Sequence, residues 1–140
     1  MNVRILDEAK AEVDSAVGSG ETIARGQGER LYRHYLGVIE WAQQFPHSGS
    51  PIAGLETERD VRGFLLGARL PFTAVIAIGP DELVVVALAH HSREPGYWRT
   101  RLELQDRIVS NLDLGIVRAL TVVLLDRRVD RHKPKEGDDG

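Results

Sequence analysis

The side chains of this sequence that could do chemistry gather in one short stretch near residue 90. Residues 89–101 read AHHSREPGYWRTR, in which His90, Arg93 and Tyr97 lie close together. Cleavage of an RNA strand needs a base for the ribose 2′-hydroxyl, cations for the charge that develops on the phosphate, and an acid for the leaving oxygen. These three residues, together with Arg62 of an earlier segment, are the candidate catalytic set of a ribonuclease.

The same residue types also suit a surface that binds another protein and does no chemistry. Arginine and aromatic side chains carry much of the binding energy at protein interfaces. In this second hypothesis the stretch forms a binding edge, together with two arginines that lie earlier in the chain. The candidate target-binding residues are Arg62, Arg69, Arg93, Tyr97, Trp98 and Arg101.

A third interpretation is structural, because the stretch follows an unbroken apolar run and can close a sheet. His90 then ends a buried strand with its imidazole hydrogen-bonded to backbone. Side chains alternate along a strand, so His91 faces the opposite way and only one of the two histidines can join a given site. Tyr97 and Trp98 fold back after a Pro-Gly turn and cover the edge of the sheet.

The arginines have structural explanations as well. Three of them can be solvated or can pair with Glu94 and Glu103 nearby in the sequence: Arg93, Arg99 and Arg101. Arg62 lies within a predicted strand, so its guanidinium needs a partner or open water. That requirement makes Arg62 the strongest single functional candidate.

Length and composition narrow the class of protein. The chain has 140 residues, 42% of them hydrophobic and 28% charged, which suits one soluble globular domain. It has no run of about 18 apolar residues, so no membrane span is expected.

The residue types give no sign of a metal site. Without cysteine there is no thiolate ligand, and two adjacent histidines without a carboxylate cluster do not indicate a metal site. We therefore expect no metal and no cofactor. An acidic start, MNVRILDEAK, argues against export and favours a cytoplasmic protein.

The balance of charged residues helps to decide whether the target is RNA or a protein. Residues 1–101 hold 11 Lys and Arg against 13 Asp and Glu, and only one of these basic residues is a lysine. A protein that works on ribosomal RNA gains affinity from many contacts of lysine and arginine with phosphate. This balance therefore disfavours RNA cleavage and leaves binding to a protein as the favoured hypothesis.

Periodicity predicts one strand and two helices in the first half. Residues 2–6 alternate polar and apolar and indicate a short strand. Asp7 caps a helix that should end or kink at the glycines of 18–20. A second helix builds from Glu21 and is firmest over 29–45, where apolar residues recur at steps of three and four. Residues 46–51 read as a loop.

In the second half the period of the apolar residues changes from that of a helix to that of a strand. This pattern predicts three strands, over 60–66, 72–78 and 83–89. A tight GPDE turn should join the last two into a hairpin. The order is that of an α+β fold: a small, antiparallel-rich, four-stranded sheet (β-α-α-β-β-β) with the two N-terminal helices packed on it. The domain should end near Arg101.

A C-terminal extension follows. We interpret residues 102–132 as a helical extension, although a strand within it fits the periodicity equally well, and residues 133–140 as a disordered tail. The segment 114–125, LGIVRALTVVLL, is too apolar to stay exposed. It should pack back on the domain or form a homodimer contact.

Four stretches of residues 3–101 stand out by their order and spacing: ILDEAKAEV, IEWAQQFPHSG, DVRGFLLGARLPFTAVI and DELVVVALAHHSREPGYWRTR. Together they resemble the RelE/ParE toxins of type II toxin–antitoxin systems, and the ParE-like plasmid stabilisation proteins above all. Phe72 and Ile76 stand where the family often has tyrosines, so both hydroxyls are lost.

The resemblance implies a toxin domain over residues 1–101 that a cognate antitoxin neutralises. ParE-like members inhibit growth by binding DNA gyrase, which requires no catalysis by the toxin. RelE-like members instead cleave messenger RNA on the ribosome. Here His90 or His91 could act as base or acid and Tyr97 as an acid or a stacking platform. The arginines that could bind phosphate are Arg62, Arg69 and Arg93. A decayed member without toxicity is the third possibility that the resemblance leaves open.

Overall fold

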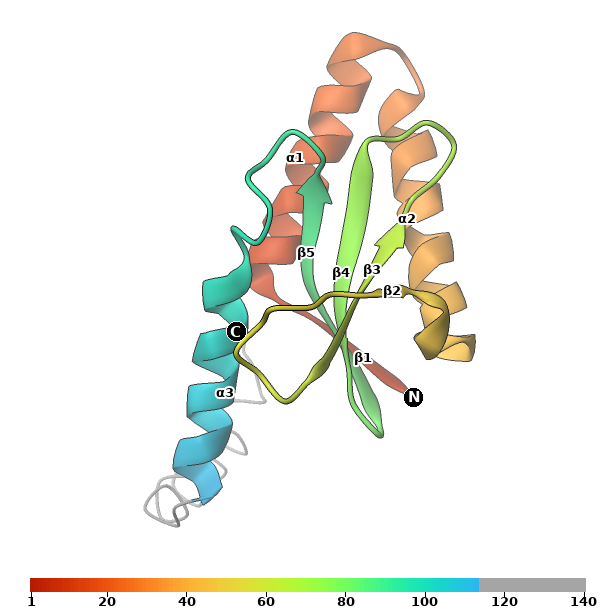
Figure 1. The fold of residues 1–140 in the computed structure, drawn as a ribbon. Helices are drawn as coiled ribbons and strands as arrows, with labels where there is room; N and C mark the ends of the chain where they lie inside the picture. Colours follow the sequence, from red (N-terminus) through yellow and green to blue (C-terminus); the bar gives the residue numbers. More distant parts are fainter. Residues whose placement is uncertain (114–140) are drawn as a thin grey trace, which may run out of the picture. The chain divides into compact units, whose positions relative to one another are not determined.

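Residues 1–113 are described by this computed structural model, and residues 114–140 lie outside the described part (Figure 1). The expectations for most of the extension, for the tail and for a homodimer contact through residues 114–125 therefore lie outside the described residues. Residues Met1–Leu102 form one compact unit.

The sheet has five strands rather than the four predicted: β1 (Asn2–Ile5), β2 (Ser50–Pro51), β3 (Asp60–Leu65), β4 (Phe72–Ile78) and β5 (Glu82–His90). Their spatial order is β1-β5-β4-β3-β2. Strand β1 is parallel to β5, and the other neighbours are antiparallel. The additional strand is the two-residue β2, which sequence analysis assigned to a loop and which follows a 3₁₀ turn (Pro46–Ser48).

The predicted hairpin of β4 and β5 is confirmed. Ile78 pairs with Leu83 beside the turn, and Phe72 pairs with His90 at the far end of the strands. The backbone N–H of Gly79 donates to the carbonyl of Glu82 and closes the turn at 2.8 Å. Because β5 lies between β1 and β4 and is buried from Leu83 to Leu88, its unbroken apolar sequence is explained by a central position.

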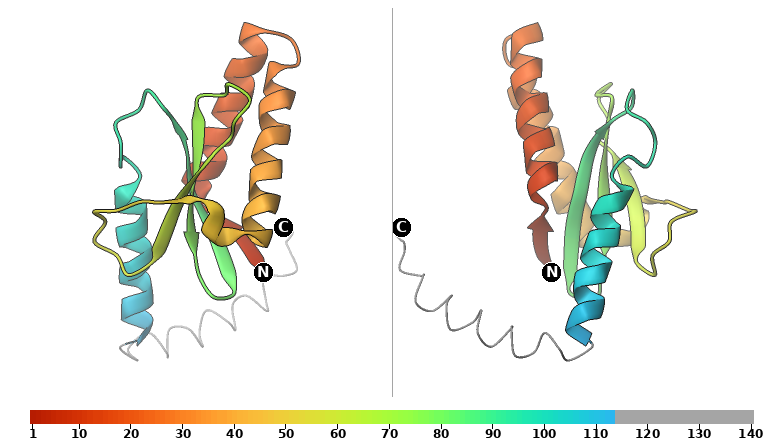
Figure 2. Two further views of the ribbon diagram at one scale, coloured as in Figure 1. Left: turned by 45° about the vertical axis from the view of Figure 1, so that its right-hand side comes forward. Right: turned by 90° about the vertical axis from the view of Figure 1, so that its left-hand side faces the viewer.

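Helices α1 (Asp7–Ile23) and α2 (Gln27–Gln44) cover one face of the sheet (Figure 2). The prediction that the glycines of 18–20 end or kink the first helix was wrong, and so was the start of the second helix at Glu21. Helix α1 instead continues through these glycines to Ile23. Gly20 permits the close crossing with α2, where a Cβ would come within 3.2 Å of the Gly28 nitrogen. Gly26, with φ +84°, makes the turn instead.

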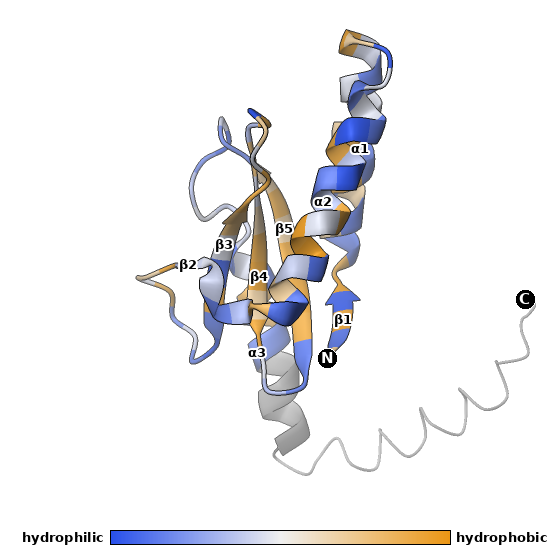
Figure 3. Ribbon diagram, turned by 90° about the vertical axis from the view of Figure 1, so that its right-hand side faces the viewer, coloured by the Kyte–Doolittle hydropathy of each residue, from blue (hydrophilic) through white to orange (hydrophobic). Residues whose placement is uncertain are grey.

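The core fills the space between the helices and the sheet. Ile76, Leu83 and Val85 are fully buried, and the helices contribute an apolar face that includes Leu31 and Tyr35. Figure 3 shows the hydrophobic residues concentrated on β4 and β5, with hydrophilic residues over much of the helices. No helix within residues 1–113 is long and apolar enough to cross a membrane.

Helix α3 (Arg99–Asp113) begins inside the stretch that resembles the toxin family. Leu102, in its first turn, is 2% exposed and belongs to the core of the first unit. The boundary that we expected at residue 101, between domain and extension, thus falls within a helix.

Candidate functional site

The segment after β5 folds back on the sheet, as predicted. The N–H of Arg93 donates to the carbonyl of His90, and the N–H of Tyr97 donates to that of Glu94. Gly96 has φ +80°, which lets the chain reverse at the Pro-Gly turn. Trp98 is 5% exposed, so it closes the core.

A carboxylate that sequence analysis did not single out holds this segment in place. Glu12 of α1 accepts hydrogen bonds from the Tyr97 hydroxyl at 2.7 Å and from the Leu88 N–H at 3.0 Å. Both Nη atoms of Arg101 donate to its two oxygens, at 3.0 and 2.9 Å. We call Glu12, Tyr97, Arg101 and the Leu88 N–H the Glu12 network.

The expectation that Arg101 is solvated or pairs with Glu94 or Glu103 was wrong. Its side chain is 15% exposed and also donates to the carbonyl of Val86 at 2.9 Å. A two-pronged guanidinium–carboxylate pair satisfies both groups away from water. The one sequence signal for the true partner is that Glu12 lies on the face of α1 that buries Ala9, Val13 and Ala16.

The network fixes the protonation of its members. Burial raises the pKa of Glu12, but the hydrogen bonds from Arg101, Tyr97 and Leu88 outweigh burial, so the pKa lies below its usual value. The pKa of Arg101 is raised, chiefly by its hydrogen bonds to Glu12. Burial and the hydrogen bond to Glu12 raise the pKa of Tyr97 to about 12.

The ring of Tyr97 also carries a stacked cation. The guanidinium carbon of Arg93 lies 3.8 Å from the ring centroid, and that of Arg101 lies 5.3 Å from it. Arg93 itself is exposed. The ring therefore orders an arginine that faces solvent.

The two histidines face opposite sides of the sheet, as strand alternation predicted. His90 packs edge-on against Phe72 at 4.9 Å between ring centroids, whereas His91 Nε2 lies 2.9 Å from the hydroxyl oxygen of Thr73. His90 Nδ1 accepts the backbone N–H of Ser92 at 3.0 Å. The backbone hydrogen bond expected of His90 is therefore present.

Arg62 has the partners that its position in a strand requires. Its Nε donates to Asp60 at 3.0 Å, and its Nη1 donates to the carbonyls of His47 and Gly49 at 2.7 and 3.0 Å. The side chain is 17% exposed. These bonds attach the loop before β2 to β3.

Arg62 is also remote from His90. It pairs with Ile76 of β4, whereas His90 pairs with Phe72. Four positions along a strand correspond to about 13 Å, and the two residues are further separated by two strand spacings of about 4.8 Å each. The structure does not bring Arg62 together with the other candidate catalytic residues.

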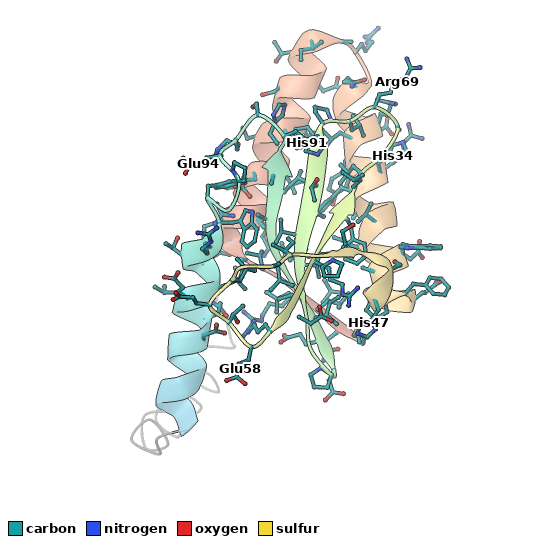
Figure 4. All side chains as sticks on the ribbon, viewed as in Figure 1. His34, His47, Glu58, Arg69, His91 and Glu94 are labelled. Carbon is teal, nitrogen blue, oxygen red and sulfur yellow. The ribbon has the colours of Figure 1, made fainter. Side chains whose placement is uncertain are left out.

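Arg69 lies elsewhere again, in the turn between β3 and β4. It is exposed, and its φ is +64°. Figure 4 shows it near His34 and well away from Glu94 of the closing segment.

A groove of about 490 Å³ lies beside the closing segment. We call it the closing groove. Three of the four candidate catalytic residues, His90, Arg93 and Tyr97, line it together with His91 and Trp98, and Thr73 lines its sheet side. Both histidines therefore border one groove, whereas the sequence predicted that only one of them could join a given site. Three of the six candidate target-binding residues therefore share one surface, of which Arg93 is the exposed member.

No group of three metal-ligating side chains that could hold an ion occurs within residues 1–113.

Comparison with known proteins confirms the fold. No family model and no curated protein matches the sequence. Among solved structures, a chain of "Chromosomal ParDE TA system from P. aeruginosa" is similar at 19% identity and a TM-score of 0.52. The match covers 64% of this chain and 95% of that chain. The toxin–antitoxin resemblance seen in the sequence thus agrees with the likeness in fold.

Proposed function

We propose that this protein is the toxin of a type II toxin–antitoxin module and that it acts, like ParE, by binding DNA gyrase. The fold and the closing motif support the first part. The second part is supported by one observation: of the four candidate catalytic residues, Arg62 lies apart from the closing groove and is bonded elsewhere, and the Tyr97 hydroxyl is held by Glu12.

Tyr97 is poorly suited to proton transfer. A general acid works best with a pKa near the pH of the reaction, and the pKa of Tyr97 is raised to about 12. Its hydroxyl already donates to Glu12. The phenol therefore supports structure and stacking rather than catalysis.

The closing segment is better prepared for binding. Arg93 is held against the Tyr97 ring, which in turn is fixed by Glu12, so an exposed guanidinium is ordered before any partner arrives. Ordering a long side chain on binding costs about 0.5–1.5 kcal/mol, and this arrangement removes part of that cost. We assign target binding to Arg93 and to the edge of the Tyr97 ring.

The alternative is a RelE-like endoribonuclease. In its favour, His90, His91 and Arg93 line the same groove, so an imidazole and a guanidinium could reach a phosphate there. Arg62 could not take part in that site, for the reason of distance given above. A decayed member that has lost toxicity is the remaining alternative.

The proposal includes a cognate antitoxin and a cytoplasmic location, where both that partner and gyrase would be found. Coexpression with the product of the adjacent gene should restore growth, and the two proteins should copurify. If neither happens for either neighbouring gene, the toxin assignment loses its main support.

Growth inhibition in cells separates the two activities. Under gyrase binding, His90→Ala and His91→Ala should inhibit growth as the parent does, whereas Arg93→Ala should inhibit it at least about tenfold less. Arg25→Ala, an exposed arginine between α1 and α2, is the matched control. A histidine variant that is about a hundredfold less active, with cleaved transcripts in the parent, would favour the nuclease.

A further inference from the structure

A cleft of about 430 Å³ lies between α1 and the adjacent ends of β4 and β5. We call it the helix-side cleft, because α1 and α2 supply much of its lining, including Ser15, Ser19 and Leu31. It borders the closing groove at two residues, His90 and Arg93, and shares no others with it. Most of its surface therefore has no part in the proposed function.

The helix-side cleft is long and narrow. Of the α1 residues that line it, Glu12 is the first and Ile23 the last. At about 1.5 Å per residue, the distance between these two residues along the helix axis is about 16 Å. A volume of about 430 Å³ over that length suits an extended ligand rather than a compact one.

The floor of the cleft is apolar. Three buried leucines form it: Leu31 of α2, Leu70 before β4 and Leu88 of β5. Ile23, at the C-terminal end of α1, is 82% exposed and adds nothing to the core. An apolar side chain that stays open to water beside an apolar floor is typical of a surface that a ligand covers.

The end of the cleft beside β5 carries a positive charge and a hydrogen-bond donor. Arg93 is exposed, stacks on the Tyr97 ring and has no acidic partner within residues 1–113. Nδ1 of His90 accepts the N–H of Ser92, so the imidazole proton lies on Nε2, which is left as a donor. This end of the cleft therefore suits an anion.

Glu12 borders the same end but does not oppose an anion there. Each of its carboxylate oxygens accepts a hydrogen bond from Arg101, so its charge is balanced within the protein. Among the described residues that line the cleft, Arg93 is the only lysine or arginine. The cleft therefore suits a ligand with one anionic group at one end, and a polyanion such as RNA or an acidic peptide would find no further cation along it.

We propose that the helix-side cleft binds a fatty carboxylate. The carboxylate accepts hydrogen bonds from Arg93 and from Nε2 of His90 at the one basic end of the cleft. The unbranched chain lies along α1, over the leucine floor, and covers Ile23. A ligand of this kind matches the length of the cleft, its apolar floor and its single cation.

The test titrates the full chain with sodium decanoate by isothermal calorimetry, below the concentration at which decanoate forms micelles. One decanoate should bind per chain. Decylammonium has the same apolar chain with a positive head, and it should bind at least about tenfold more weakly because Arg93 repels it. Acetate has the carboxylate without the chain and should show no measurable binding, because it covers no apolar surface. Binding is measured without gyrase or an antitoxin, so its failure would leave the proposed function as it stands.

Two pairs of variants locate the site. Arg93→Gln removes the cation and should weaken decanoate binding about tenfold, whereas Arg33→Gln, at an exposed arginine outside the cleft, should change it less than about twofold. Ser19→Phe fills the cleft with a ring and should abolish binding. Ala11→Phe places the same ring on α1 outside the cleft and should leave binding intact. The proposal is overturned if decanoate does not bind, if decylammonium binds as tightly, or if either control variant weakens binding as much as its partner.

Discussion

Arg101 and Arg69 are both arginines beside the same sheet, but they stand in opposite situations. Arg101 donates hydrogen bonds to Glu12 and to the carbonyl of Val86, and its side chain is largely buried. Arg69 is exposed, has no acidic partner in the described part of the chain, and lies in a backbone conformation that costs energy. Residue type alone does not distinguish an arginine that holds the fold from one that is available to a partner.

The largest effect should come from breaking the Glu12 network. Glu12→Ala leaves the guanidinium of Arg101 buried without its carboxylate, and we expect a loss of about 3 kcal/mol in the free energy of unfolding, measured by urea denaturation. Asp14→Ala, an exposed acid on the same helix, is the control and should change stability by less than about 0.5 kcal/mol. Equal effects of the two variants would show that the network does not stabilise the fold.

Protonation of Glu12 in acid should also lower the free energy of unfolding. The loss should be smaller than that of Glu12→Ala, since a protonated carboxyl keeps some of its hydrogen bonds. The pKa of Glu12 in the folded protein lies below its usual value of 4.5. Its stabilisation is therefore fully present above pH 4.5 and is lost as the pH falls through the lower, folded-state pKa. Denaturation at a series of pH values should show this loss in the parent, and Glu12→Gln should reduce its slope. An unchanged slope in the variant would contradict the assignment.

The smallest effect has the opposite sign. Arg69→Gly places glycine where φ is positive, so it should raise the free energy of unfolding by about 0.5–1 kcal/mol. Urea denaturation beside the parent measures the difference. A variant that is less stable than the parent would contradict the cost assigned to this backbone conformation.

The local parts of this fold could be read from the sequence. The hairpin of β4 and β5 was predictable because two apolar runs flank a tight turn, and the reversal at Pro95-Gly96 because of its turn residues. The extent of helix α1 was not, since Gly20 serves a contact with Gly28 rather than a break in the helix. Strand β2 has only two residues, and neither residue type favours a strand.

The candidate site was less predictable because its key contacts join distant residues. Glu12 and Arg101 are 89 positions apart, and no local pattern links them. The available signal was that Glu12 falls on the buried face of a predicted helix. A buried carboxylate needs a partner, but the sequence does not show which residue that partner is. The requirement that Arg62 be paired was correctly inferred, but the partners proved to be Asp60 and backbone carbonyls.

The central claim is that this protein acts by binding a protein target and not by cleaving RNA. The most direct measurement adds the purified full chain to DNA gyrase in a supercoiling assay, beside a ribosome-dependent messenger RNA cleavage assay. We predict that supercoiling falls and cleaved DNA accumulates, equally with the parent and with His90→Ala, while messenger RNA stays intact. Unaffected gyrase together with cleaved messenger RNA would contradict the claim.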